Sequence, residues 1–227
     1  MSHPTLSEYQ KGFVNFLVAS GALTFGDFVT KSGRRTPYFV NTGKFNDGHK
    51  IGTLGSYYAA HIKAMLNPLP QVVFGPAYKG IPLAVSTVIA MKRDHDINTG
   101  FSFDRKEEKD HGDGGTIVGT PITPGTRLVI VEDVITAGTT LRLMVPLLRD
   151  TLKAEIAGVV ISCDRCERGS GSKSAVSEAQ DELGLSVLPL INIHQIAAYL
   201  SEPNPSGLLL NAELLGRIRD YLAEYGA

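Results

Sequence analysis

Two adjacent carboxylates, Glu132 and Asp133, directly follow the apolar run at residues 128–131. Such a run is typical of a buried strand, and open α/β sheets bind ligands at the carboxyl ends of their strands. Residues 134–140 are mostly small or hydroxylated and lead into a segment with helical spacing. Backbone N–H groups in a loop of this kind can approach a phosphate, and the helix N-terminus favours negative charge. Because the carboxylates would repel a phosphate, they suit ribose hydroxyls or a divalent ion. The string predicts a sugar-phosphate site, although two acids that merely precede and cap a helix remain the plainer interpretation.

A polar stretch at residues 103–115 combines the cations Arg105, Lys106 and Lys109 with His111 and three glycines. One interpretation is a solvated hairpin with interspersed charge. The other is a loop that closes over a pyrophosphate, with its cations as charge partners and its glycines as hinges, and excludes water from the reacting centre. The residues by themselves leave both interpretations open.

Composition indicates one folded domain spanning residues 1–227. The chain is 43% hydrophobic and 20% charged, which is enough apolar surface for a sizeable core. Its formal net charge of -1 gives no overall attraction to nucleic acid or anionic membranes. No apolar run approaches the ~18 residues of a membrane span, and the N-terminus lacks the features of a leader. We expect a cytoplasmic protein with neither a nucleic-acid nor a membrane partner.

The two cysteines, Cys163 and Cys166, are too few for a disulfide framework. Their C-x-x-C spacing formally matches a redox motif or half of a zinc site. A second pair is missing, and no histidine stands at ligand spacing. A structural or incidental role is therefore the favoured interpretation.

Strands and helices alternate along the predicted chain. Apolar runs and turn residues predict strands at residues 25–30, 38–42, 72–74, 100–103, 116–119, 128–131, 156–162 and 185–188. Helical spacing predicts helices at residues 5–20, 51–65, 81–92, 141–148 and 194–200 and around Leu215, Ile218 and Leu222, the first of them with a Thr5/Glu8 capping box. Residues 169–173 are expected to form a surface loop. The alternation predicts an α/β fold with a parallel sheet, and the N-terminal elements predict a small appended subdomain.

The string at residues 129–140 resembles the phosphoribosyl pyrophosphate (PRPP) binding motif of type I phosphoribosyltransferases, with its apolar residues, two acids and T-x-G-T/S loop. Four further segments resemble motifs of the orotate phosphoribosyltransferase family in particular. They are the K-S-G-R-x-S/T-P-Y-F signature at residues 31–39, the pyrophosphate loop at 74–82, the catalytic loop at 103–115 and the D-R-x-E-R-G segment at 163–169. Neither a Walker A loop nor a G-x-G-x-x-G fingerprint occurs, which disfavours ATP and NAD.

The resemblance implies a parallel-sheet phosphoribosyltransferase core with helices on both faces, at about residues 46–190. A hood would comprise about residues 1–45 and part of the C-terminal region. The implied activity is that of a pentosyltransferase, which transfers the phosphoribosyl group of PRPP to N1 of orotate. The products would be orotidine 5′-monophosphate and pyrophosphate, in de novo pyrimidine (UMP) biosynthesis. The family also implies Mg²⁺ as cofactor and a homodimer whose 104–115 loop is shared across subunits.

The resemblance assigns roles to individual residues. PRPP contacts fall to Lys31, Tyr78, Lys79, Arg105, Lys106, Lys109, His111, Glu132, Asp133, Val134, Ile135, Thr136, Ala137, Gly138, Thr139 and Thr140. Orotate contacts fall to Phe39, Val40, Thr136 and Arg165. Catalysis is assigned to Lys109, His111, Asp133 and Lys31. Mg²⁺ would be bound mainly through PRPP and water near Glu132 and Asp133, with no direct protein ligand. The chain departs from many relatives at Val40, where they have a second aromatic residue.

Three alternatives compete with this hypothesis. A phosphoribosyltransferase for another base, such as a purine, would share the 132–140 motif, but the hood signature and Arg165 argue against it. A regulator of the same fold that binds PRPP as a signal would carry a basic face or an added DNA-binding domain, and would not need Lys109 and His111. A thiol-redox function based on Cys163 and Cys166 is the remaining alternative.

Overall fold

A six-stranded sheet forms the centre of the computed structural model, which describes residues 6–30, 33–105, 116–135, 138–169 and 171–227. The strands lie in the order β5-β4-β3-β6-β7-β8, and all neighbours are parallel except the antiparallel pair of β4 and β5. Their bounds are β3 (Val72–Phe74), β4 (Gly100–Asp104), β5 (Ile117–Gly119), β6 (Arg127–Glu132), β7 (Glu155–Asp164) and β8 (Val187–Asn192). The expected α/β fold with a mostly parallel sheet is confirmed.

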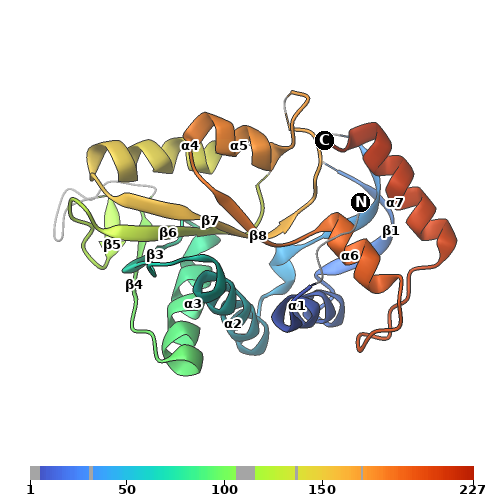
Figure 1. Ribbon diagram of the computed structural model, residues 1–227, viewed down its shortest axis with the longest axis horizontal. Coiled ribbons are helices and arrows are strands. Elements are labelled where there is room, and N and C mark those ends of the chain that lie inside the picture. The colour runs from blue at the N-terminus through green and yellow to red at the C-terminus, as the bar shows by residue number, and fades with distance from the viewer. Residues whose placement is uncertain (1–5, 31–32, 106–115, 136–137, 170) are drawn as a thin grey trace.

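Helices cover both faces of this sheet (Figure 1). One face carries α1 (Glu8–Ala19), α2 (Gly48–Met65) and α3 (Gly80–His95), and the other carries α4 (Thr139–Pro146) and α5 (Ala175–Leu183). Side chains of β6 alternate between the two cores: Val129 and Val131 pack with the first group of helices, and Leu128 and Ile130 with the second. Because both faces are buried, the strand is apolar throughout.

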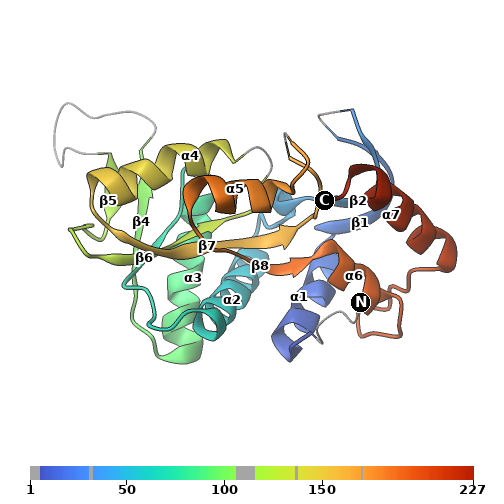
Figure 2. The ribbon, with the colours of Figure 1, turned by 45° about the horizontal axis from the view of Figure 1, so that its top comes forward.

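A separate two-stranded sheet lies beside the C-terminal helices (Figure 2). Strands β1 (Leu23–Val29) and β2 (Arg35–Val40) pair antiparallel, and α6 (Ile193–Leu200) and α7 (Ala212–Tyr225) follow β8. Helix α7 packs on β2 through the perpendicular rings of Tyr38 and Tyr221, whose centroids are 5.7 Å apart. Within the described residues, no helix has the length and apolar character needed to cross a lipid bilayer.

Several predicted boundaries were wrong. Helix α1 begins at Glu8, and its capping box is formed by Ser7 and Gln10 rather than by Thr5 and Glu8. Thr5 itself lies outside the described residues. Met65 ends the predicted helix at residues 51–65 and is 51% exposed at the end of α2. Helix α5 was missed because most of its residues are polar and only Val176, Ala179 and Leu183 are buried.

A buried histidine at the contact of α1 with α2 makes stability depend on pH. His61 is 2% exposed, and its Nδ1 is 2.9 Å from the hydroxyl oxygen of Tyr9. Burial lowers the pKa of His61 to about 4. As the pH falls from about 6.5 to about 4, His61 is protonated in the unfolded chain but stays neutral in the folded chain. The free energy of unfolding therefore decreases over this range.

We expect His61→Asn to weaken the loss of stability in that acid range. The wild-type free energy of unfolding should fall by about 2–3 kcal/mol more than that of the variant between about pH 6.5 and 4. Urea unfolding at a series of pH values measures the difference. His49→Asn, at an exposed position, is the matched control and should leave the wild-type slope unchanged. Parallel curves for wild type and His61→Asn would contradict the assignment.

Candidate active site

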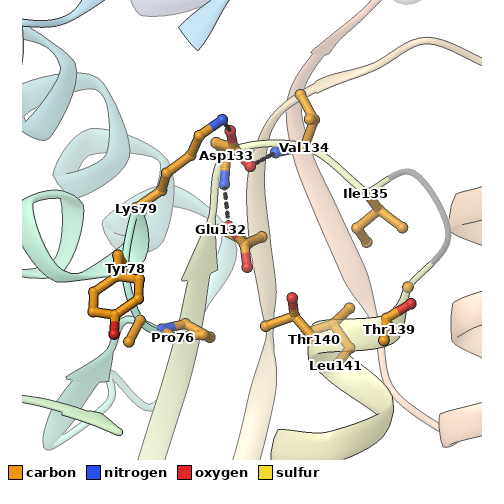
Figure 3. A pocket seen from close by; sticks show the side chains of 12 residues that line it. Pro76, Tyr78, Lys79, Glu132, Asp133, Val134, Ile135, Thr139, Thr140 and Leu141 are labelled. Carbon is orange, nitrogen blue, oxygen red and sulfur yellow. Dashed lines mark hydrogen bonds and ion pairs between the residues drawn. The ribbon is translucent and has the colours of Figure 1, made fainter. Parts of the chain in front are cut away.

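A pocket of about 330 Å³ opens at the carboxyl end of the parallel strands (Figure 3). Three segments line it: the loop after β3, the end of β6 and the start of α4. The first contributes Tyr78 and Lys79, the second Glu132 and Asp133, and the third Thr139 and Thr140. The pocket therefore joins carboxylates, a cation and hydroxyls at the edge where parallel sheets bind ligands.

The loop after β3 is held by close backbone packing. A Cβ on Gly75 would overlap the backbone of Gly80, and one on Gly80 would lie 2.6 Å from the Gly75 carbonyl carbon. The backbone N–H of Ala77 donates to Asp104 Oδ1 at 2.6 Å, and Asp104 is only 4% exposed at the end of β4. Side chains at the two glycines would push the loop apart, so this tight turn requires glycine.

Three groups of the described residues donate hydrogen bonds to Asp133. The Lys79 ammonium and the Thr42 hydroxyl donate to Oδ2 at 2.8 and 2.7 Å, and the Val134 N–H donates to Oδ1 at 2.8 Å. Burial pushes the pKa of Asp133 upward, but these donors outweigh burial, so the pKa lies below its ordinary value. Asp133 is therefore ionised at neutral pH and can accept hydrogen bonds from sugar hydroxyls.

Glu132 is the last residue of β6 and is partly buried. Burial raises the pKa of its carboxyl group. The hydrogen bond from the Asp133 N–H lowers this pKa, and the nearby Asp133 carboxylate raises it, so the net shift is upward. The backbone beside it is fixed from two sides: Tyr58 donates to the Glu132 carbonyl at 2.8 Å, and Ser162 Oγ donates to the Asp133 carbonyl at 2.5 Å. The strand end that presents the two carboxylates is therefore rigid.

The entry into α4 is suited to an anion. Gly138 occupies the N-cap position with a positive φ of 68°, which favours glycine. The first turn of α4 contains no acidic residue, and the hydroxyls of Thr139 and Thr140 line the pocket. Free N–H groups and the helix dipole make such a terminus attractive to phosphate.

Arg165 directly follows β7, the strand that neighbours β6 in the sheet. It does not line the pocket of Figure 3. Its guanidinium is already paired with Glu167 Oε1, at 2.5 Å from Nη2 and 2.9 Å from Nε. The same guanidinium lies over the ring of Tyr38, 5.4 Å from its centroid. Tyr38 in turn donates to Glu167 Oε1 at 3.0 Å, so this ion pair connects the loop after β7 to strand β2.

The predicted site residues fall into three groups. Those that line the pocket together are Tyr78, Lys79, Glu132, Asp133, Val134, Ile135, Gly138, Thr139 and Thr140. Those that are described but do not line it are Phe39, Val40, Arg105 and Arg165. Those that lie outside the described residues are Lys31, Lys106, Lys109, His111, Thr136 and Ala137. The choice between hairpin and closing loop concerns residues 106–115, also outside the description, although β4 and β5 on either side pair antiparallel.

Four residues were not identified from the sequence, although their hydrogen bonds fix the Asp133 side chain, the end of β6 and the loop after β3. They are Thr42, Tyr58, Asp104 and Ser162. Asp104 directly precedes Arg105 in the polar stretch, which was a usable signal. Tyr58 and Ser162 are polar groups in a helical and an apolar segment, and Thr42 lies in a polar turn; in none of the three segments does the sequence contain a pattern that separates them from ordinary positions.

Among the side chains that the structure describes, the thiols and the acidic residues form no second kind of centre. Cys163 and Cys166 are both free, and burial raises the pKa of each thiol, which disfavours a reactive thiolate. Among the described residues, no three His, Cys, Asp or Glu side chains are grouped as a metal site. These observations agree with a structural role for the cysteines.

The fold and the pocket define a phosphoribosyltransferase. The sequence profile of the phosphoribosyl transferase domain matches residues 43–182, which include the loop after β3, both carboxylates and the start of α4. Curated relatives indicate which phosphoribosyltransferase family the chain belongs to. The chain is 48% identical over 223 residues to an orotate phosphoribosyltransferase of Bifidobacterium longum, covering 95% of this chain and 96% of the relative. It is 43% identical to one of Clostridium beijerinckii, covering 98% and 100%.

A solved structure extends the likeness to three dimensions. The orotate phosphoribosyltransferase of Francisella tularensis superposes with a TM-score of 0.83 at 33% identity, covering 95% of this chain and 100% of that one. The chain belongs to the orotate phosphoribosyltransferase family, whose enzymes act in pyrimidine biosynthesis. The resemblance of its motifs to this family is confirmed.

Proposed function

We propose that this chain transfers the phosphoribosyl group of PRPP to N1 of orotate and releases pyrophosphate, with orotidine 5′-monophosphate as product. The observation that carries the proposal is the pocket in which an ionised carboxylate, a lysine and an acid-free helix N-terminus face one another. A ribose ring with a phosphate at C5 and a pyrophosphate at C1 presents hydroxyls to the first and anions to the other two. The relatives' shared name supplies the base, orotate.

The ribose would lie over the end of β6. Asp133 and Glu132 accept hydrogen bonds from its two ring hydroxyls, and residues 134–140 enclose the 5′-phosphate at the start of α4. As the bond from C1 to pyrophosphate breaks, positive charge grows on the ring near these carboxylates. Their fixed position therefore favours the transition state through electrostatics rather than through a covalent step.

The leaving pyrophosphate would be held by cations. Lys79 is 68% exposed and bound only at its tip, so it can turn from Asp133 toward a pyrophosphate beside Tyr78. Arg105, Lys106, Lys109, His111 and Lys31 are the further cationic or proton-donating groups that we assign to it. Lys109, assisted by His111, neutralises the charge that develops on the leaving group.

The donor set fits a magnesium ion that arrives with its substrate. Mg²⁺ commonly combines one or two carboxylates with waters and substrate phosphates, and the pocket offers Glu132 and Asp133 but no cluster of three ligands among the described side chains. When bound, the ion would neutralise charge on the pyrophosphate oxygens. The protein's own contribution is to hold the two carboxylates near it.

Orotate would enter between the pocket and the loop after β7. Arg165 can bind its carboxylate, the Phe39–Val40 backbone can contact the ring, and Thr136 can donate from the phosphate loop. Because Glu167 already pairs with Arg165, the orotate carboxylate must share or displace this partner. Glu167 thereby makes the site selective for a substrate with a strong anion.

We further propose that β1, β2 and α7 act as the hood over this site, with residues 46–190 as the core. Direct contacts support this: Thr42, just beyond β2, bonds to Asp133, and Tyr38 on β2 bonds to Glu167. We also propose a homodimer that shares the 104–115 loop across subunits, as the family resemblance implies. We also propose a location in the cytoplasm, since two cysteines are too few for a disulfide framework.

The test follows the ultraviolet absorbance of orotate in the presence of PRPP and Mg²⁺, repeated with adenine, hypoxanthine and uracil. PRPP-dependent loss of orotate alone is the expected result. Turnover with a purine instead would replace orotate as the base. Saturable PRPP binding without turnover of any base would indicate a regulator of this fold.

A further inference from the structure

Thr42 contacts the active-site carboxylate from outside the recognised motifs. Its hydroxyl donates to Asp133 Oδ2 at 2.7 Å, and the Lys79 ammonium reaches the same oxygen at 2.8 Å. Lys79 also lies 3.4 Å from the Thr42 hydroxyl. Thr42 and Lys79, from separate parts of the chain, therefore meet at one oxygen of Asp133, whose side chain is only 16% exposed.

The backbone holds Thr42 in this place. It begins the short 3₁₀ helix Thr42–Lys44, which directly follows β2, and the Asn41 side chain caps this helix by accepting from the Gly43 N–H at 3.0 Å. The Asn41 N–H donates to the Ala22 carbonyl at 2.7 Å, which ties the turn to the segment before β1. The hydroxyl is thus delivered by a fixed turn, whereas the Lys79 ammonium is at the end of a long, exposed side chain.

We infer that Thr42 is a positioning residue that orients Asp133 for the ribose hydroxyls. The inference rests on the proposed function and deepens it. When Lys79 turns toward pyrophosphate, Thr42 is the donor that stays on Oδ2, while the Val134 N–H stays on Oδ1. A neutral hydroxyl restrains the rotation of the carboxylate without cancelling its charge, so Asp133 keeps its capacity to accept from the sugar. Thr42 thereby links the end of hood strand β2 to PRPP binding.

Thr42→Val tests the hydroxyl, since valine keeps the shape and removes the donor. We expect the KM for PRPP to rise about ten-fold with kcat within about two-fold, because the variant keeps the charge of Asp133 and loses only the orientation that binds the ribose hydroxyls. Thr42→Ser restores the hydroxyl and should return KM to within about two-fold of wild type. In an Asp133→Asn background, Thr42→Val should have no further effect on PRPP affinity, because its partner is already altered.

The matched control is Thr87→Val on α3. Thr87 is fully buried, and its hydroxyl has no hydrogen-bond partner among the described residues, so the same atoms change without loss of a bond. This variant should keep wild-type kinetics. An unchanged KM in Thr42→Val, a Thr42→Ser variant as impaired as Thr42→Val, or a full effect of Thr42→Val in the Asp133→Asn background would each overturn the inference.

Wild-type turnover separates this inference from the proposed function. If wild type fails to turn over orotate, the proposed function fails, and calorimetric titration with PRPP still compares Thr42→Val with wild type. If wild type is active and Thr42→Val binds PRPP equally well, the inference alone fails. Should Thr42→Val not fold, Thr42→Ala and Thr42→Ser supply the same comparison.

Discussion

Replacement of Lys109 by alanine is expected to lower kcat about a thousand-fold while weakening PRPP binding less than about ten-fold. The leaving pyrophosphate gains negative charge as its bond to C1 breaks, and an ammonium that meets this charge acts mainly in the transition state. Lys109 lies outside the described residues, so the prediction rests on its motif. Pre-steady-state turnover and calorimetric PRPP titration measure the two quantities separately.

Lys173→Ala is the control for this variant, because it removes a surface lysine that pairs with Asp181 away from the pocket. It should retain wild-type turnover. Equal losses of kcat and PRPP affinity in Lys109→Ala would rule out a transition-state role and leave Lys109 as a ground-state contact.

The same variant tests the proposed sharing of the loop between subunits. If Lys109 serves the partner's site and Asp133 its own, a heterodimer of Lys109→Ala with Asp133→Asn contains one intact site and one doubly altered site. Random mixing should then restore up to about a quarter of wild-type activity, since half of the dimers are mixed and each has one working site of two. No recovery on mixing would place the loop over its own subunit's site.

Sequence predicted the parts of this molecule that depend on local patterns. The run at residues 128–131 is apolar because β6 is buried on both faces, and the two acids that follow it in the sequence therefore lie at the carboxyl end of that strand. Loop 75–80 was located by its glycines, which close backbone approach requires at Gly75 and Gly80, and residues 138–140 were located by Gly138, which has a positive φ, and the two threonines after it. These constraints act within a few neighbouring residues, so a single sequence is enough to predict them.

The contacts that hold the site in place depend on distant pairs and were not predictable. Thr42 and Asp133 are 91 residues apart, and Tyr58 and Glu132 are 74 apart. Arg165 was predicted to contact orotate, but its pairing with Glu167 and its position over Tyr38 depend on how β2 packs against the loop after β7, so neither contact was predicted. Helix α5 was missed for a local reason, because only a narrow stripe of apolar residues on it contacts the core.

Asp133→Asn is expected to lower kcat/KM for PRPP by about a hundred-fold. Oδ1 faces the Val134 N–H and Oδ2 faces the donors Thr42 and Lys79, so both oxygens act as acceptors. An asparagine amide has one oxygen and one NH₂ group, so either orientation sets a donor against a donor. The substitution therefore removes the charge that faces the ribose and also turns the side chain away from its present geometry.

Asp181→Asn provides the matched control, because it removes one carboxylate from an exposed ion pair with Lys173. Such surface pairs contribute about 0–1 kcal/mol, so its kinetics and Tm should match those of wild type. Steady-state kinetics, PRPP titration and Tm on the same Asp133→Asn sample distinguish a binding defect from unfolding. Wild-type kcat/KM in that variant would show that the ribose hydroxyls do not bind Asp133. The contacts of Asp133 with Lys79 and Thr42 would then serve to hold the end of β6 in place.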